Sequence, residues 1–65
     1  MTMAKARRRA GLLQRQVAQA LNVSLGTVAM WDTGRNKPLA DMLPKIAKLY
    51  GCTVDDLLED GNEKE

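Results

Sequence analysis

Residues 14–33, QRQVAQALNVSLGTVAMWDT, decide the fold of this 65-residue chain. Val17, Ala18 and Leu21 recur at the spacing of one buried helix face, so the stretch predicts a helix from Gln14 to Leu21. Asparagine tolerates the left-handed backbone conformation better than most residues, so Asn22 predicts a sharp turn directly after that helix.

A second helix is predicted from Leu25 to Asp32, because the Ser24 hydroxyl can cap its first turn. Val28 and Trp31, three residues apart, face the core, and Thr33-Gly34 forms the closing turn. Four residues are left for the opposite or flanking surfaces: Leu25, Gly26, Ala29 and Met30. Two helices joined in this way form a helix-turn-helix, and an ordinary αα-hairpin of a helical bundle is the alternative.

A first helix is expected after Thr2, which can act as its N-cap, and Gly11 should end it. The inward side chains predicted for this segment are Met3, Ala6, Ala10 and either Leu12 or Leu13.

Two further helices are expected downstream. Asp41 is the predicted N-cap of a helix that runs through Tyr50, with Pro44 in the first turn, where proline is tolerated. Thr53 is the predicted cap of a short fifth helix, and Val54, Leu57 and Leu58 close the core or form a dimer contact with the end of helix four.

No stretch shows the period-two alternation of a strand, so the fold class expected is all-α, a compact five-helix domain over residues 1–59. Residues 60–65 are polar, with no apolar anchor, and are expected to form a disordered acidic tail.

The net charge is only +2, but its distribution is uneven. Residues 1–48 carry nine Lys or Arg against two Asp, a charge of +7, and residues 49–65 carry six acids against one Lys, a charge of −5. A basic body favours a polyanionic partner, although any single residue of this group could simply be a solvated charge.

Composition argues against several other functions. The chain has one cysteine and no histidine, so it lacks the sets of ligands that build zinc sites, and Cys52 and Tyr50 have no evident base partner for catalysis. The acids Asp55, Asp56, Glu59 and Asp60 lack the spacing of a calcium loop. We therefore expect that the protein is not an enzyme and that it binds no metal, cofactor or small-molecule ligand. No apolar run reaches the roughly 20 residues of a membrane span, and a cytoplasmic protein is expected.

The chain as a whole resembles the lambda-repressor-like, XRE-type family of phage Cro proteins, repressors and bacterial regulators. The residues that carry the resemblance are RRRAGLLQRQVAQALNVSLGTVAMWDTGRNKP, which includes residues 14–33, and LPKIAKLYGCTVDDLL. The resemblance covers about Met3 to Leu58. It implies a DNA-binding transcription regulator, a repressor of phage or mobile-element type, that inserts its third helix into the major groove of double-stranded DNA as a homodimer.

The resemblance also implies roles for individual residues. Arg7 and Asp32 would form a partly buried structural ion pair. The residues that would contact phosphates are Gln14, Arg15, Arg35, Asn36 and Lys37. Those that would contact base edges are Ser24, Leu25, Gly26, Thr27 and Met30.

The sequence departs from the family pattern on the third helix, where relatives usually carry Gln, Arg, Asn or Ser. Leu25, Gly26 and Met30 cannot make bidentate hydrogen bonds to bases. Contact with thymine methyl groups, close backbone approach at Gly26, DNA shape, or weak specificity remain open, as does a protein-interaction module on the same fold. Leu13 replaces the usual N-cap of helix two, so its N–H should be met by water or by Gln16.

Overall fold

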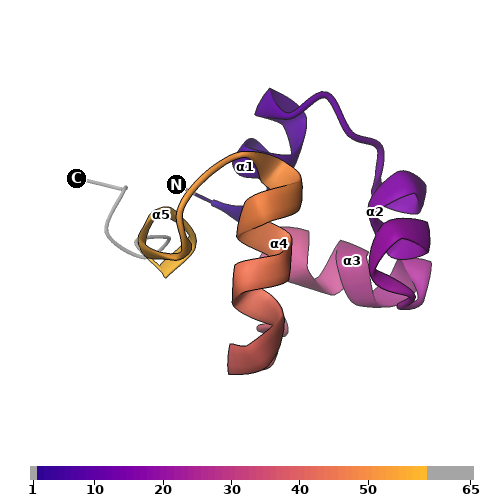
Figure 1. Ribbon diagram of the computed structural model, residues 1–65. Coiled ribbons are helices and arrows are strands. Elements are labelled where there is room, and N and C mark those ends of the chain that lie inside the picture. The colour runs from indigo at the N-terminus through magenta and orange to yellow at the C-terminus, as the bar shows by residue number, and fades with distance from the viewer. Residues whose placement is uncertain (1, 59–65) are drawn as a thin grey trace.

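Five α-helices and one 3-10 turn make up residues 2–58, the part of the chain that the computed structural model describes (Figure 1). The elements are α1 (Met3–Arg9), α2 (Gln14–Leu21), α3 (Leu25–Thr33), η1 (Ala40–Met42), α4 (Leu43–Tyr50) and α5 (Val54–Leu58). No strand occurs within these residues. The all-α prediction is therefore confirmed, whereas the predicted acidic tail, residues 60–65, lies outside the described residues.

The helix α1 begins as predicted, because the Thr2 hydroxyl oxygen accepts a hydrogen bond from the backbone N–H of Lys5 at 3.0 Å. Met3 and Ala6 are buried, as expected. The inward placement of Ala10 is wrong: this residue is exposed, because it is the C-cap of the helix and its N–H bonds back to the Ala6 and Arg7 carbonyls. Of the two leucines that follow, Leu12 packs against the core and Leu13 is exposed.

The two central helices pack as the sequence predicts. The helix α2 has the predicted bounds, and Asn22 ends it in the left-handed conformation, with φ 60° and ψ 45°. Ser24 caps α3, which runs one residue further than predicted, to Thr33, before Gly34 turns the chain at φ 78°. Val28 and Trp31 of α3 are buried, at 0% and 4% exposed.

The predicted role of Asp41 is wrong. Leu39 is the extended residue that precedes η1, and Asp41 lies inside η1, where it cannot occupy the extended position from which a side chain caps a helix. The N-cap of α4 is instead Met42, which offers no side-chain hydrogen bond. Pro44 does lie in the first turn of α4, as expected.

The helix α5 is held by a reciprocal cap. The Thr53 hydroxyl accepts from the Asp56 N–H at 3.0 Å, and an Asp56 carboxylate oxygen accepts from the Thr53 N–H at 3.2 Å. Thr53 is thus the cap that the sequence predicts. Leu57 is 4% exposed and closes the core, whereas Leu58 is 61% exposed.

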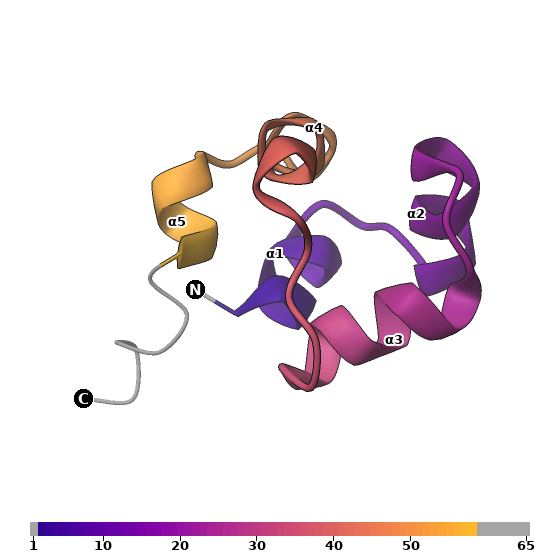
Figure 2. The ribbon, with the colours of Figure 1, turned by 90° about the horizontal axis from the view of Figure 1, so that it is seen from below.

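One core joins all five helices. Its members are Met3, Ala6, Val17, Ala18, Val28, Trp31, Ile46, Ala47, Tyr50 and Leu57. In Figure 2, α1 lies between α4 on one side and α3 on the other, in agreement with the contacts of α1 to both helices. The core therefore uses the inner side of α3 and leaves its outer side, remote from α4, to other contacts.

Candidate nucleic-acid interface

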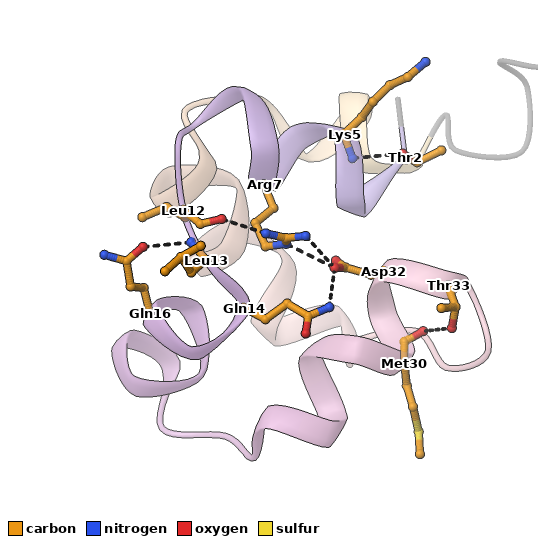
Figure 3. A network of polar contacts seen from close by, with 10 residues as sticks. All are labelled: Thr2, Lys5, Arg7, Leu12, Leu13, Gln14, Gln16, Met30, Asp32 and Thr33. Carbon is orange, nitrogen blue, oxygen red and sulfur yellow. Dashed lines mark hydrogen bonds and ion pairs between the residues drawn. The ribbon is translucent and has the colours of Figure 1, made fainter.

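Arg7 and Asp32 tie α1 to the end of α3. The Arg7 guanidinium places Nη2 at 3.0 Å and Nε at 3.1 Å from Asp32 Oδ2, and its Nη1 donates to the Leu12 carbonyl oxygen at 2.7 Å (Figure 3). The two side chains are 10% and 7% exposed. The structure thus brings together the two residues that the resemblance pairs, and the same guanidinium also holds the linker that leads into α2.

Gln14, the first residue of α2, joins this ion pair. Its Nε2 donates to Asp32 Oδ2 at 2.8 Å, so one carboxylate oxygen accepts from both Arg7 and Gln14 (Figure 3). Sequence reasoning missed this contact, since nothing in the apolar spacing marks a polar pair 18 residues apart. An amide nitrogen carries two hydrogens, so one remains for the phosphate contact that the resemblance assigns to Gln14.

The charge of Asp32 also acts on the phenol of Tyr50. Within residues 2–58, Asp32 Oδ1 and the Tyr50 hydroxyl are buried without a hydrogen-bond partner. Burial, and then the negative charge of Asp32, raises the pKa of Tyr50 to about 12. The folded protein therefore favours the protonated phenol.

The backbone N–H of Leu13, at the start of α2, was expected to bond to water or to Gln16, and it bonds to Gln16. The Gln16 side chain folds back, and its Oε1 accepts from the Leu13 backbone N–H at 2.7 Å. Leu13 itself is 54% exposed. Arg15, in the same first turn, is exposed on the surface.

The outward face of α3 is apolar. Leu25 is 52% exposed, Met30 is 45% exposed, and Gly26 is also exposed, whereas Thr27 and Ala29 are half-buried. The polar atoms at the start of this face bond to each other: the Ser24 and Thr27 hydroxyl oxygens are 2.8 Å apart, and the Thr27 N–H donates to the Ser24 hydroxyl at 3.1 Å. Of the five residues expected to contact base edges, Ser24, Leu25, Gly26 and Met30 are thus exposed and Thr27 is half-buried.

The loop after α3 folds back onto the end of that helix. The N–H groups of Arg35 and Asn36 donate to the Met30 carbonyl oxygen at 3.1 and 3.4 Å, and the Asn36 side-chain amide lies 4.0 Å from the Met30 sulfur. The side chains of Arg35 and Lys37 are exposed. Positive charge thus sits beside the C-terminal end of the apolar face, and Arg15 adds another at the start of α2.

A family model described as helix-turn-helix matches residues 3–57, which is most of the chain. The chain belongs to the helix-turn-helix family. This confirms the family resemblance, and with the five helices it confirms the predicted fold.

A curated relative supports the same family. The HTH-type transcriptional activator BcrR of Enterococcus faecalis is 36% identical over 47 residues, which cover 72% of this chain and 23% of that protein. The chain therefore spans about a quarter of the length of this relative. No solved structure matches the chain significantly.

Residues 2–58 include one thiol, that of Cys52. Cys52 is half-buried, and burial, followed by the charge of Asp56, raises its thiol pKa, so the reactive thiolate is disfavoured. Among residues 2–58, no three Asp, Glu, Cys or His side chains gather where they could hold a metal ion. Over the same range, none of the helices has both the length and the apolarity that crossing a membrane requires.

Proposed function

We propose that this helix-turn-helix domain binds double-stranded DNA sequence-specifically, with α3 in the major groove, and regulates transcription without catalysing a reaction. The observation that carries the proposal is the outward face of α3, which the core does not use and which exposed cations flank. A helix of this kind fits the width of the major groove, and cations beside it can neutralise the phosphates that line that groove.

The side chains divide into two groups by what they can touch. Phosphate contacts are assigned to the start of α2 and to the loop after α3, namely Gln14, Arg15, Arg35, Asn36 and Lys37. Base contacts are assigned to the start and the outward face of α3, namely Ser24, Leu25, Gly26, Thr27 and Met30. The first group would set affinity for any sequence and the second would set preference.

The wider setting follows from the same proposal. We infer a homodimer on a two-fold symmetric site, a repressor of phage or mobile-element type, and action in the cytoplasm, where such DNA lies. Within the described residues, the exposed Leu58 on α5 is the apolar side chain best placed for the subunit contact, because Leu57 is already in the core. Leu58→Lys should then convert a dimer to a monomer in sedimentation equilibrium without lowering its helix content.

The test of DNA binding uses charge removal at two places. Kd for a mixed-sequence duplex is measured by fluorescence anisotropy at about 50 and 200 mM salt, a range in which phosphate contacts show clearly. Arg35→Ala/Lys37→Ala should weaken binding and lower the slope of log K against log salt by about 0.9 for each lost contact. Lys45→Ala/Lys48→Ala is the matched control, because it removes the same charge from exposed positions on α4.

Equal losses in the two double variants would mean that only net charge matters and would contradict the placement of α3 against DNA. If the unmodified protein does not bind duplex DNA at low salt, the proposal fails. The exposed Leu25 and Met30 would then favour the alternative function, a protein-interaction module on the same fold.

A further inference from the structure

We infer that the base feature recognised by α3 is the thymine C5-methyl group, contacted by Leu25 and Met30. This inference rests on the proposed function and specifies the DNA that the domain prefers. Its basis is the set of hydrogen bonds that the hydroxyl and carboxyl side chains from Ser24 to Thr33 make, and the atoms that remain exposed once those groups are paired.

The hydroxyl and carboxyl side chains of α3 and of its N-cap Ser24 already make hydrogen bonds within the chain. Asp32 accepts from Arg7 and Gln14, and the Thr33 hydroxyl donates to the Met30 carbonyl oxygen at 3.1 Å. The hydroxyls of Ser24 and Thr27 share one hydrogen bond, which leaves a single hydroxyl proton between them. That proton can reach one acceptor, whereas purines are distinguished by pairs of hydrogen bonds.

The exposed remainder of this face is hydrocarbon and thioether. Leu25 is the first residue of α3, and Met30 lies five residues further along it; they are 52% and 45% exposed. Gly26 lies between them with no side chain, so that the backbone can approach the DNA closely. The Asn36 side-chain amide lies 4.0 Å from the sulfur of Met30.

The major groove offers one apolar feature among the four bases of ordinary DNA. Thymine carries a C5-methyl group there beside its O4 acceptor, whereas the other three bases present hydrogen-bond donors and acceptors without a methyl group. An apolar face of the protein against those base edges would leave their donors and acceptors without hydrogen bonds. Against thymine, the same face buries the methyl group in contact with the side-chain carbons. The basic flanks Arg15, Arg35 and Lys37 complement the phosphates on either side, so DNA is the occupant that both the apolar and the charged parts of the surface fit.

The test removes the methyl groups and nothing else from the base pair. Sequences that bind the full chain are selected from random duplex DNA, and the recovered sites are resynthesised with deoxyuridine at each thymidine position. Each contacted thymine should contribute about fourfold to affinity, the value of one buried methyl group, so one contact in each of two half-sites gives a loss of about fifteenfold.

Variants separate methyl contact from any change in DNA shape. Leu25 and Met30 lie outside the core, so Leu25→Ala and Met30→Ala should leave the thermal unfolding temperature nearly unchanged. Each substitution should reduce the ratio of the affinities for thymidine and deoxyuridine sites. Leu39→Ala is the control, because Leu39 is 74% exposed but lies outside α3, and it should keep the full ratio.

Equal affinity of the unmodified protein for thymidine and deoxyuridine sites would overturn the inference and leave the proposed DNA binding intact. A ratio that persists in Leu25→Ala/Met30→Ala would also overturn it, because the methyl groups would then act through DNA shape. Failure to recover any duplex at low salt would overturn both the inference and the proposed function.

Discussion

Gln14 and Arg7 donate to the same oxygen of Asp32, Gln14 from 2.8 Å and Arg7 from 3.0 and 3.1 Å. This one atom therefore joins the end of α1, the start of α2 and the end of α3 (Figure 3). The relative placement of α2 and α3 defines a helix-turn-helix, so the carboxylate of Asp32 adds a polar restraint to the apolar packing of these two helices.

Replacing Arg7 tests the contribution of its ion pair with Asp32 to stability. Arg7→Ala leaves the Asp32 carboxylate buried without its charge partner and should lower the free energy of unfolding by about 3 to 5 kcal/mol. Urea denaturation measures the loss, with Arg8→Ala as the control, since Arg8 is exposed beside it on α1. Arg7→Ala and Arg8→Ala of equal stability would show that the ion pair does not hold the fold.

Gln14 should have two roles that separate in measurement. Gln14→Ala removes a hydrogen bond to a charged group and should lower stability by about 1.5 kcal/mol. It should also weaken binding to all DNA sequences by a similar factor, because a phosphate contact carries no sequence information. Urea denaturation and anisotropy on two unrelated duplexes give the two values. Loss of stability with unchanged DNA affinity would show that Gln14 acts only through its hydrogen bond to Asp32.

Tyr50 should make stability depend on alkaline pH. Its pKa rises from 10.0 to about 12 on folding, so the folded state favours the protonated phenol. The stabilisation is fully present below pH 10 and is lost as pH rises through 12, by on the order of 2 kcal/mol. Tyr50→Phe lacks this ionisation, and the difference between the two proteins isolates it from lysine titration.

At neutral pH, Tyr50→Phe should not be destabilised, because the hydroxyl that it removes is buried without a hydrogen-bond partner. Denaturant midpoints at pH 7, 10 and 12 test both statements. Parallel loss of stability in the two proteins between pH 10 and 12 would contradict the alkaline effect of Tyr50. A lower midpoint of Tyr50→Phe at pH 7 would contradict the second statement.

Gly26 should trade stability against DNA affinity. A Cβ at this position meets only the Ser24 hydroxyl oxygen, at 3.9 Å, so Gly26→Ala fits the free protein and should stabilise it by up to about 1 kcal/mol through helix propensity. The same methyl group would stand between the backbone of α3 and the base edges. We expect affinity for a selected site to fall by about tenfold, or about 1.4 kcal/mol. A more stable variant that binds DNA as tightly as the parent would exclude close approach at Gly26.

The sequence predicts the scaffold of the domain better than its polar contacts. The bounds of α2 follow from the spacing of Val17, Ala18 and Leu21, because only a helix brings these positions to one face, and the turn follows from the left-handed tolerance of Asn22. The Asp41 cap failed, since capping depends on the direction from which the chain enters a helix, and that direction is set here by η1.

The contact of Gln14 with Asp32 was not predictable for another reason. It depends on the packing that brings the start of α2 to the end of α3 and on the orientation of one flexible amide. The outward face of α3 was predictable as a surface from Val28 and Trp31 on its inner side. The hydrogen bond between the Ser24 and Thr27 hydroxyls, which leaves mainly apolar groups free on that surface, could not be predicted from the sequence.

Selection of bound sequences from random duplex DNA, carried out at two salt concentrations, tests the central claim most directly. The account predicts recovery of a two-fold symmetric, thymine-containing site, with half-sites about one helical turn apart and an affinity that falls steeply as salt rises. Recovery of no enriched sequence, with no retention of duplex DNA even at the lower salt concentration, would contradict it.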